Sequence, residues 1–444
     1  MNLIYGIKDK PKFGQTLVFA FQQILAILAA TIAVPSIIGN GMSQAAALFG
    51  AGVGTLVYIL FTRANSPVFL GSSFAFIGSM FAAFGGAVSM QVGYAGLIIG
   101  AISAGLVYVV IALVVKVAGV SWINKLMPAV VIGPTVAIIG LSLAGNAVGD
   151  LTTGKVMVDG VSAASPYVCL VCGLVTLFAV VLCSVYGKKM FKLIPFIIGI
   201  LAGYAVAAIF TVIGIATENT ALQVINFEAF KSMTLFAVPE FTFLEAFKGI
   251  KDIDGSYIAT VVVAYVPVAF VVFAEHIADH KNLSSILGQD LLVKPGLHNT
   301  LLGDGVGSMA GAFFGGCPNT TYGESVGCVA ITGNASVVTI LTTAVMAMLI
   351  SFFGPFVTFL SSIPNCVMGG VCITLYGFIA CSGLKMLQKV DLGENRNLFV
   401  AAVILITGIG GLSVTFGKVT ITSIACALIL GIFTNVILSG KDKK

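Results

Sequence analysis

Long apolar runs, separated by short polar or charged segments, make up most of the chain. A helix that spans a bilayer needs about 20 mostly apolar residues. Hydropathy predicts fourteen such spans, of which the ninth and tenth are short and rich in glycine. Their predicted limits are 14–38, 43–62, 67–86, 94–115, 127–147, 166–186, 193–215, 256–278, 300–316, 318–332, 335–355, 364–384, 397–413 and 419–438.

The composition agrees with a membrane protein. The 444 residues are 58% hydrophobic and only 9% charged, whereas soluble domains carry about 25% charged residues. Such a chain cannot cover a surface in water, but it suits a solvent of lipid tails. We therefore expect an all-α polytopic fold in one transmembrane domain, residues 1–444. The polar segment 1–13 precedes the first apolar run, which we interpret as a span and not as a signal peptide.

The basic residues are distributed unevenly between the two sides of the predicted membrane. With the N-terminus inside, only a few of the 22 basic residues lie outside, namely Lys155, Lys231, Lys248, Lys251 and Lys418. Because cytoplasmic loops are enriched in Lys and Arg, we expect a multi-pass protein of the bacterial plasma membrane with both termini in the cytoplasm. The acidic loop 216–255 lies outside and divides the chain into two halves of seven spans.

Two halves with an odd number of spans enter the membrane in opposite senses, as in inverted-repeat transporters, whose sites lie near the midplane. A pair of interrupted spans occupies equivalent places in the two halves, Pro67–Phe76 and Gly316–Glu324. In an alignment, Ser72-Ser73-Phe74-Ala75-Phe76 falls on Thr320-Thr321-Tyr322-Gly323-Glu324. The matched pair favours a binding site over the alternative, which is glycine-rich helix packing with hydroxyls bonded within their own helix.

The physical basis lies in the backbone. Proline and glycine end a helix, so a short extended strand is expected in each segment. Lipid cannot satisfy the N–H and C=O groups of an extended strand, which must therefore be buried in protein or line a cavity. There they can bond a polar ligand, toward which the following half-helix directs its positive N-terminal end.

Carboxyl groups within a membrane are costly and usually functional. Glu324 lies in the tenth predicted span, and Glu275 lies at the end of the eighth. Helical spacing places Glu275 and Asp279 on one face, one turn apart. The alternative interpretation, which hydropathy leaves open, is that this cluster is only the cytoplasmic flank of the eighth span.

Three further polar positions accompany these acids. His276 and His280 form an i, i+4 pair without a third metal ligand, so we expect no metal site. Asp304 either bonds the end of a half-helix or marks a loop. Gln22 and Gln23 lie within the first span, where amides more often tie helices together than bind a ligand.

The remaining chemistry excludes several classes. Cys169 and Cys172 form a CxxC inside an apolar run and are interpreted as small hydrophobic residues. No patch of basic residues is dense enough for nucleic acid, and no pairing of a nucleophile with a base indicates an enzyme. We therefore expect no catalytic residue, no metal and no cofactor.

Several stretches resemble a known family. They are Gly71-Ser-Ser-Phe-Ala-Phe-Ile77, Ala274-Glu-His-Ile277, Asp290-Leu-Leu…Pro295-Gly-Leu-His298, Pro318–Glu324 and Glu324-Ser-Val-Gly327-Cys-Val-Ala-Ile-Thr332-Gly333. The last stretch is similar to a family signature. The signature begins with an acidic residue, Gln or Pro, continues with Asn, any residue and Gly, and after any four residues ends with Thr followed by Arg, Lys or Gly. From about Phe13 to Ser439 the sequence resembles the nucleobase/ascorbate transporter family, and within it the bacterial members that carry uracil.

The resemblance implies a fold and a set of site residues. It implies a core domain (about 14–115 and 256–355), a gate domain (about 123–215 and 364–438) and a homodimer formed through the gate domains. Substrate would lie between short strands in the third and tenth spans. The positions that match substrate contacts are Phe74, Glu275, Tyr322, Gly323 and Glu324, with Ala30 packing on the ring and Gln23, Thr321 and Ser325 in support.

The sequence departs from the family pattern at three positions. Ser325 replaces the usual Asn, Gln23 stands where many members carry His, and Asp279 stands where the best-known uracil-transporting type has His. These changes bear on proton handling more than on the substrate. Glu324, together with the run Ser72–Phe76, is similar to the uracil branch and not to the xanthine or urate branch.

The expected mechanism follows from the hydrogen bonds that uracil offers. Glu324 would accept from a ring N–H with help from the Gly323 backbone, and the Phe74 backbone N–H would donate to a carbonyl oxygen. Glu275 would bond the other edge. Because burial favours the neutral form of a carboxyl group, Glu275, with Asp279 one turn away, is the expected proton carrier. The expected function is proton-coupled uracil import by alternating access, of the elevator type.

Two other functions stay open at this stage. One is a proton-coupled permease for a purine such as xanthine in the same fold. The other is an anion transporter or channel of the same architecture, against which the two acidic residues of the expected site argue.

Overall fold

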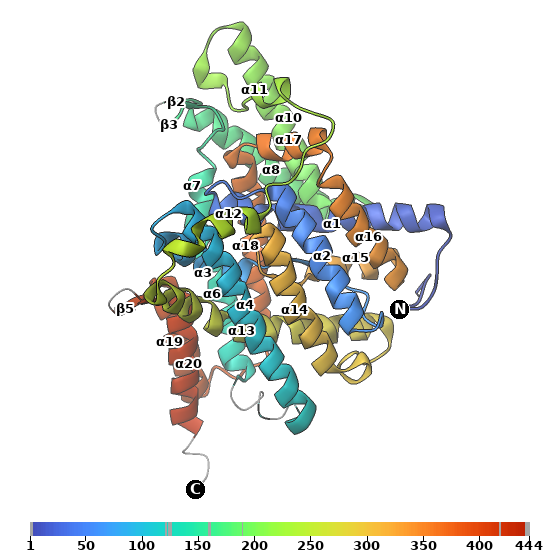
Figure 1. Cartoon of the computed structure of the whole chain (residues 1–444), viewed down its shortest axis with the longest axis vertical. Helices are drawn as coiled ribbons and strands as arrows, with labels where there is room; N and C mark the ends of the chain where they lie inside the picture. The colour runs from blue at the N-terminus through green and yellow to red at the C-terminus, as the bar shows by residue number, and fades with distance from the viewer. Residues whose placement is uncertain are drawn as a thin grey trace.

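The computed structural model describes residues 3–119, 122, 127–158, 161–188, 190–416 and 419–439. The chain is mostly helical, and Figure 1 shows its course from the N-terminal α1 to the C-terminal α20. In the first half the long helices are α1 (Phe13–Ile38), α2 (Gln44–Phe61), α4 (Met90–Ala118), α6 (Ala129–Ser142), α8 (Pro166–Tyr186) and α10 (Pro195–Ala216). In the second half they are α13 (Gly255–Leu287), α14 (Leu297–Gly315), α16 (Val337–Ile350), α18 (Asn365–Leu387), α19 (Asn395–Ile409) and α20 (Ser423–Ser439).

Shorter elements complete the fold. They are α3 (Ile77–Gly85), α7 (Ala144–Asp150), α9 (Met190–Leu193), α11 (Glu228–Lys231), α12 (Thr242–Gly249), α15 (Gly323–Thr332) and α17 (Gly354–Ser362). Single turns of helix are η1 (Phe74–Phe76), η2 (Thr220–Leu222), η3 (Ile250–Asp252) and η4 (Leu292–Gly296). The strands are β1 (Leu70–Ser72), β2 (Met157–Val158), β3 (Val161–Ser162), β4 (Asn319–Thr321), β5 (Val414–Phe416) and β6 (Val419–Ile421).

Many helices of the described chain have the length and apolarity needed to cross a bilayer. Eight meet both criteria, and shorter apolar helices occur at Phe74–Gly85, Val337–Ile350, Asn395–Ile409 and Ser423–Ser439. Large apolar side chains cover much of the outer surface, among them Leu60, Val117 and Ile406. The protein is therefore a multi-pass membrane protein, and the count of fourteen spans stays a prediction.

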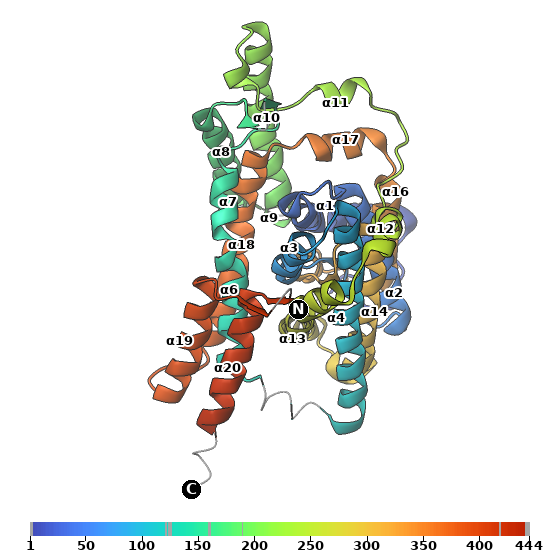
Figure 2. The same cartoon turned by 60° about the vertical axis from the view of Figure 1, so that its left-hand side comes forward.

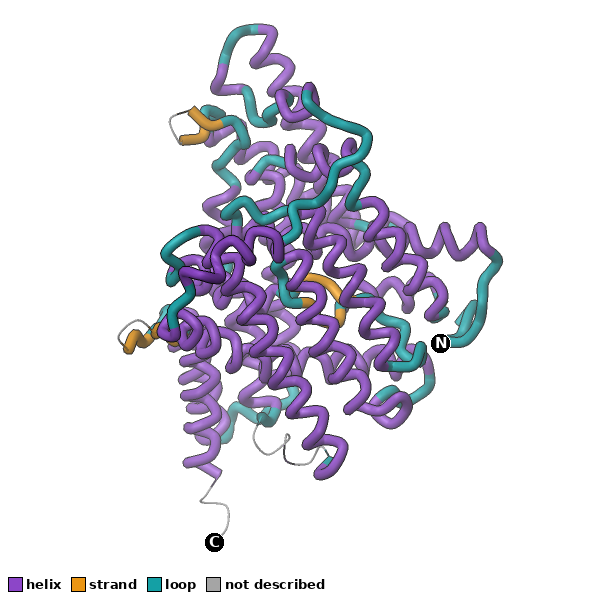
Figure 3. The backbone as a smooth tube through the Cα atoms, in the orientation of Figure 1, coloured by secondary structure: helices purple, strands orange, loops and turns teal. Residues whose placement is uncertain are grey.

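Strands β1 and β4 lie side by side in the middle of the molecule, surrounded by helices (Figure 3). They pair antiparallel, with Leu70 opposite Thr321 and Ser72 opposite Asn319. The Tyr322 N–H donates to the Phe69 carbonyl and the Ser73 N–H donates to the Pro318 carbonyl, which extends the ladder at both ends. These strands contain the two segments that the sequence analysis aligned. The pairing satisfies backbone groups that lipid could not.

Each strand leads directly into a helix. Turn η1 and α3 follow β1, and α15 follows β4 after Tyr322. The first N–H groups of a helix have no partner within it, and the helix dipole is positive there. The strand ends therefore present two helix N-termini to the same region.

The helices pack in two groups, which Figure 2 shows side by side. In the first group α14 packs against α2 and α4, and α13 packs against α4. In the second group α18 packs against α6 and α8, α10 packs against α8, and α19 packs against α6 and α20. The strand pair β1–β4 belongs to the first group, because β1 contacts α2 and β4 contacts α14.

Helices α2 and α14 approach each other closely through glycine. A methyl group at Gly50 would lie 2.3 Å from the Gly311 carbonyl oxygen, and one at Gly54 would lie 2.8 Å from the Gly307 carbonyl oxygen. Small residues permit such contact between membrane helices, which gain stability from close packing. Asn319 joins this contact, since its Nδ2 donates to the Gly50 carbonyl over 3.1 Å.

Two links between the groups run side by side at the end of the molecule where α11 and α17 lie (Figure 2). The link from α10 to α13 pairs with the link from α16 to α17 through a bridge between Phe236 and Phe353. The Ala237 N–H donates to the Phe352 carbonyl, and the Gly354 N–H donates to the Leu235 carbonyl. The two links therefore form one continuous piece of structure.

Part of the predicted charge pattern falls outside the described residues. This is the case for Lys125, Lys189, Lys418, Lys441, Lys443 and Lys444. The orientation of the termini stays a prediction.

Candidate functional site

A cavity of about 370 Å³ lies where the two helix groups meet, at the ends of β1 and β4. Its size is in the usual range for small-molecule sites. One wall comes from η1, α13, β4 and α15, and it carries the polar and charged groups. The lining residues of that wall are Ser73, Phe74, Ala75, Glu275, Ala278, Asp279, Thr320, Thr321, Tyr322, Gly323 and Glu324.

The opposite wall is mainly apolar and comes from α6, α10 and α18. Its lining residues are Val136, Ile139, Phe196, Leu375, Phe378, Ile379, Ser382 and Met386. A cavity with hydrogen-bonding groups on one side and apolar groups on the other fits a flat, polar ring.

Three carboxyl groups line this cavity. Glu275 and Asp279 lie one turn apart on α13, and Glu324 lies in the first turn of α15. Thr321 of β4 donates a hydrogen bond from Oγ1 to Asp279 Oδ2 over 2.9 Å. Glu275 and Asp279 therefore lie inside the protein against the strand pair and not on an exposed flank.

Tyr322 connects the two strands at the cavity wall. Its hydroxyl donates to the Ser72 carbonyl over 2.8 Å, and its ring covers Gly71. A methyl group at Gly71 would lie 2.3 Å from ring atom Cε2. Gly71 is therefore required because the ring occupies the space of a side chain.

Phe74 forms the contact between the polar wall and α18. Its ring lies 6.1 Å from that of Tyr376, at an interplanar angle of 79°. This edge-to-face arrangement is favourable for aromatic pairs. Phe74 is half-buried, so part of its ring faces the cavity.

Gln23, Ser325 and Ala30 lie behind the site and are not among its lining residues. Gln23 Nε2 donates a short hydrogen bond to Ser325 Oγ, which also accepts from the Phe69 N–H over 3.0 Å. Ser325 therefore ties α1 and the residue before β1 to α15. Ala30 is buried on α1, with 1% of its surface exposed.

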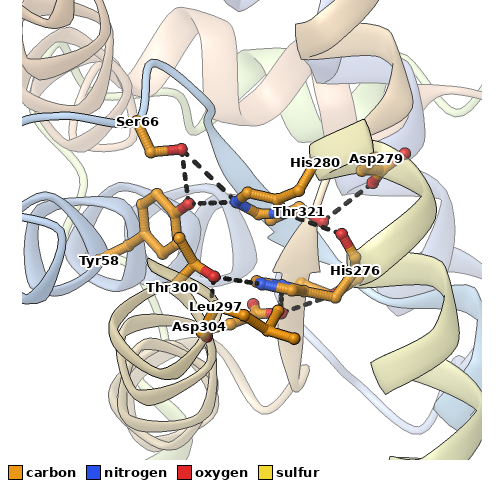
Figure 4. Close-up of polar contacts among 10 residues, drawn as sticks. Tyr58, Ser66, His276, Asp279, His280, Leu297, Thr300, Asp304 and Thr321 are labelled. Carbon is orange, nitrogen blue, oxygen red and sulfur yellow. Dashed lines mark hydrogen bonds and ion pairs between the residues drawn. The ribbon is translucent and has the colours of Figure 1, made fainter. Parts of the chain in front are cut away.

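The structure also contains a buried polar cluster that sequence reasoning did not assemble (Figure 4). His276 Nδ1 lies 2.7 Å from Asp304 Oδ2, and His276 Nε2 lies 3.0 Å from Thr300 Oγ1. Thr320 of β4 donates to Asp304 Oδ2 over 3.2 Å. Asp304 is thus inside helix α14 and does not mark a loop. The only signal in the sequence was the presence of polar residues within apolar runs.

The second histidine has its own partners. His280 Nδ1 donates to the His276 carbonyl over 2.8 Å, and its Nε2 lies 2.7 Å from the Tyr58 hydroxyl. The Tyr58 hydroxyl donates to Ser66 Oγ over 2.7 Å. Among the described residues there is no group of three or more His, Cys, Asp or Glu that could hold a metal ion.

The cavity continues toward one side of the molecule. A neighbouring hollow of about 710 Å³ shares the lining residues Ala278 and Met386 with it and includes Lys281 and Lys389. A separate hollow of about 550 Å³ is lined by residues of the α1–α2 turn and of the segment Ala237–Glu240, among others. The two hollows share no lining residue.

A membrane protein with a polar cavity between two helix groups, at the ends of two interrupted helices, belongs to the class of membrane transporters. The sequence matches the model of the permease family over residues 14–417. The chain therefore belongs to this family, the nucleobase/ascorbate transporters.

Individual relatives agree with this assignment. The chain is 39% identical to the uracil permease of Bacillus caldolyticus over 443 residues, which cover 99% of this chain and 96% of the relative. It is 38% identical to the uracil permease of Bacillus subtilis strain 168 over 441 residues, 98% of this chain and 94% of the relative. Among solved structures, the murine Slc26a9 anion transporter in its inward-facing state is similar with a TM-score of 0.65. That match has 13% identity and covers 98% of this chain and 70% of the other, so it shows a shared fold.

Proposed function

We propose that this protein imports uracil together with protons. The observation that carries the proposal is that Glu275 and Glu324 line one cavity, with Phe74 and the backbone of Gly323 beside them. Relatives named uracil permease match nearly the whole chain. The protein would act as a transporter and not as an enzyme.

The hydrogen-bonding groups of the cavity are complementary to uracil. The ring offers two N–H donors and two carbonyl acceptors. Glu324 accepts from a ring N–H, the Phe74 backbone N–H donates to a carbonyl oxygen, and Glu275 bonds the other edge. A site that bonds every polar group of its ligand discriminates strongly against analogues that lack one, because its own groups are then left unpaired.

Proton coupling would take place at α13. Carboxyl groups in a membrane interior are most stable when neutral or paired, and Glu275 and Asp279 share one wall of the cavity. A proton on Glu275 lets that carboxyl group donate to uracil and removes a charge from the moving part of the protein. The proton gradient then drives uptake.

Alternating access would arise from movement between the two helix groups. The core comprises about 14–115 and 256–355, and the gate comprises about 123–215 and 364–438. In this proposal the two halves form inverted repeats of seven spans, both termini lie in the cytoplasm, and the gate domains form a homodimer. The core carries Glu275 and Glu324 past the apolar wall of the gate, with Ala30 packing near the ring and Gln23, Thr321 and Ser325 supporting the strands.

The test is uptake of labelled uracil into liposomes that contain the purified protein. Accumulation above the external concentration is expected with an inward proton gradient, and only equilibration without one. Unlabelled uracil should compete fully and unlabelled xanthine should not. Competition by xanthine alone would instead identify a purine permease. Absence of uptake with either substrate would contradict the proposal.

A further inference from the structure

The Asp304–His276 contact lies behind strand β4, away from the cavity. Asp304 is 1% exposed and His276 is fully buried. Their polar atoms lie 2.7 Å apart, and Thr320 connects Asp304 to β4. Thr320 itself lines the cavity. The pair is therefore one residue away from the site that the proposed function uses, and it is not part of its wall.

The hydroxyl of Thr300 has two acceptors within reach. Its Oγ1 lies 3.0 Å from the Leu297 carbonyl and 3.0 Å from His276 Nε2. A hydroxyl has one proton to donate, so it can serve only one of them at a time. The choice determines how many protons the pair holds.

The first arrangement leaves the pair with a negative charge. If Thr300 donates to His276 Nε2, the ring carries its only proton on Nδ1 and donates it to Asp304. The carboxylate then keeps its charge, which Thr320 and His276 stabilise by hydrogen bonds.

The second arrangement holds one more proton. If Thr300 donates to the Leu297 carbonyl, His276 Nε2 must carry a proton and donate it to Thr300 Oγ1. The short contact between Nδ1 and Asp304 Oδ2 then contains a second proton, located on either atom. The pair is neutral overall in this arrangement. The two arrangements differ by one proton and by a rotation of the Thr300 hydroxyl, with every heavy atom in the same place.

We propose that Asp304 and His276 form a second proton-binding site of this transporter, that Thr300 is the hydroxyl that switches with it, and that Thr320 connects it to the substrate strand. This inference rests on the proposed function, because it assumes that β4 contacts uracil. The carboxyl groups of the cavity remain the first proton site.

A small void lies beside the pair, next to Asp304 and Tyr108. Asp304 Oδ1 and the Tyr108 hydroxyl are buried without a hydrogen-bond partner among the described residues. Both residues line a void of about 10 Å³, which is the space of about one water molecule. A water molecule there can donate to Asp304 Oδ1 and accept from the Tyr108 hydroxyl, so one water satisfies both buried groups.

The other groups around the pair limit its behaviour. On α13, Glu275 and Asp279 lie on the cavity side, and the His280 ring stacks on His276 with centroids 4.0 Å apart. Tyr108 of α4 approaches the His276 ring edge to face, and Tyr58 of α2 bonds His280. Glu324 of α15 lines the same cavity as Glu275 and Asp279.

The carboxyl neighbours can carry negative charge and the tyrosines carry none, so His280 is the one group named here that could become a cation. The His280 Nδ1 proton is fixed on the His276 carbonyl, and two hydroxyl groups lie within reach of Nε2, Tyr58 at 2.7 Å and Ser66 at 3.5 Å. A proton donated by either hydroxyl satisfies His280 in its neutral form. A positive charge on His276 therefore meets carboxyl groups and not a second cation. Negative charge on the carboxyl groups of the cavity favours the arrangement of the pair that holds the additional proton. A proton on Glu275 removes one of these charges and disfavours that arrangement.

The test combines nuclear magnetic resonance with uracil binding as a function of pH. The chain has three histidines, so ¹⁵N-histidine labelling gives few signals, and the variant His276→Asn assigns one of them. In the protein without uracil, the ¹⁵N chemical shifts of the His276 ring should change as pH falls. They should report either a change from a singly to a doubly protonated ring or the protonation of the neighbouring Asp304. A signal that stays constant over the whole range in which the protein is folded would overturn the inference.

The binding measurement uses the same protein. We expect the affinity of wild type for uracil to change with pH in two steps, one from the Asp304–His276 pair and one from the carboxyl groups of the cavity. His276→Asn should lose the first step and keep the second, and Glu275→Gln should lose the second. If His276→Asn does not fold, Thr300→Val decides, because valine keeps the shape and removes the hydroxyl. Thr300→Val should shift the pH midpoint of the step that belongs to the Asp304–His276 pair. Thr343→Val is the control, since Thr343 only bonds the Thr339 carbonyl of its own helix.

The outcomes separate the two proposals. If wild type binds uracil but the curves of wild type, His276→Asn and Thr300→Val coincide, the second proton site is excluded and the proposed function stands. If wild type does not bind uracil at any pH, the proposed function fails, and the resonance measurement still decides whether the pair takes up a proton.

Discussion

Thr321 donates a hydrogen bond to Asp279 Oδ2 over 2.9 Å, which joins strand β4 to helix α13 at the edge of the cavity. Asp279 lies one turn from Glu275 on the same wall. The bond therefore connects the strand that is proposed to hold uracil to the helix that is proposed to carry the proton.

Replacing Thr321 by Val tests this connection. The substitution keeps the shape of the side chain and removes the donor to a carboxyl group, and such bonds contribute about 1.5–3 kcal/mol. Uracil affinity should fall by about 10-fold or more, measured by binding of labelled uracil to purified protein. Thr342→Val is the control, because Thr342 is half-buried on α16, away from the cavity lining, and bonds only its own helix. Equal affinity for both variants would show that the bond plays no part in binding.

Glu275→Gln should separate proton coupling from substrate recognition. Gln keeps a polar group of the same size but cannot exchange a proton at neutral pH. Accumulation of uracil driven by the proton gradient should be lost, whereas exchange of labelled for unlabelled uracil across the membrane should survive. Glu218→Gln, in an exposed loop, should retain both activities. Full accumulation by Glu275→Gln would refute the role of Glu275 as proton carrier.

Gly71 and Gly78 offer a matched pair of substitutions. A methyl group at Gly71 would lie 2.3 Å from Cε2 of the buried Tyr322 ring, whereas the nearest atom to one at Gly78 is Ile424 Cδ1 at 3.9 Å. Gly71→Ala must displace the ring and break its bond to the Ser72 carbonyl. We expect uracil binding to fall by at least about 10-fold in Gly71→Ala, since a lost buried bond and a steric shift each cost about 1–3 kcal/mol. Gly78→Ala should bind as wild type does. Wild-type binding by Gly71→Ala would contradict the proposed role of the strand pair.

Ser325 should be important for stability. Ser325→Ala leaves the Phe69 N–H without its acceptor and leaves the Gln23 amide only the longer bond to the backbone carbonyl of residue 325, 3.4 Å, and an unsatisfied buried group costs about 1–3 kcal/mol. The midpoint of thermal unfolding in detergent should fall below that of wild type. Ser361→Ala removes an exposed hydroxyl that bonds only the Thr358 carbonyl and should leave the midpoint unchanged. A common midpoint for both variants would show that the Ser325 contacts contribute nothing to stability.

Sequence reasoning brought together Phe74, Glu275, Tyr322 and Glu324, and all four line one cavity in the structure. The resemblance to the nucleobase/ascorbate transporters selected these four positions. The interrupted apolar runs point independently to the two segments that contain Phe74, Tyr322 and Glu324, because their backbone must be shielded from lipid. Membership of the permease family, inferred from the resemblance, is confirmed by the family match over residues 14–417.

The cluster around Asp304 could not be predicted in the same way. His276 and Asp304 belong to different helices, and their contact depends on how α13 and α14 pack beside β4. Hydropathy does not determine such packing, because an apolar helix surface gains no hydrophobic free energy when it exchanges lipid tails for the apolar side chains of another helix. For the same reason the sequence left open whether Asp304 lies in a helix or in a loop. The apolar wall from α6, α10 and α18 also carried no signal, since its residues are ordinary for membrane helices.

The location of bound ligand tests the central claim most directly. An experimental structure of the protein with 5-bromouracil, in which the bromine is identified by its anomalous scattering, would place the ring without ambiguity. We predict that the ring lies in the cavity of about 370 Å³, with its polar edges toward Glu275 and Glu324 and the Phe74 backbone. A ring bound in the hollow lined by Pro35 and Glu240, with the cavity between Glu275 and Glu324 unoccupied, would contradict the account.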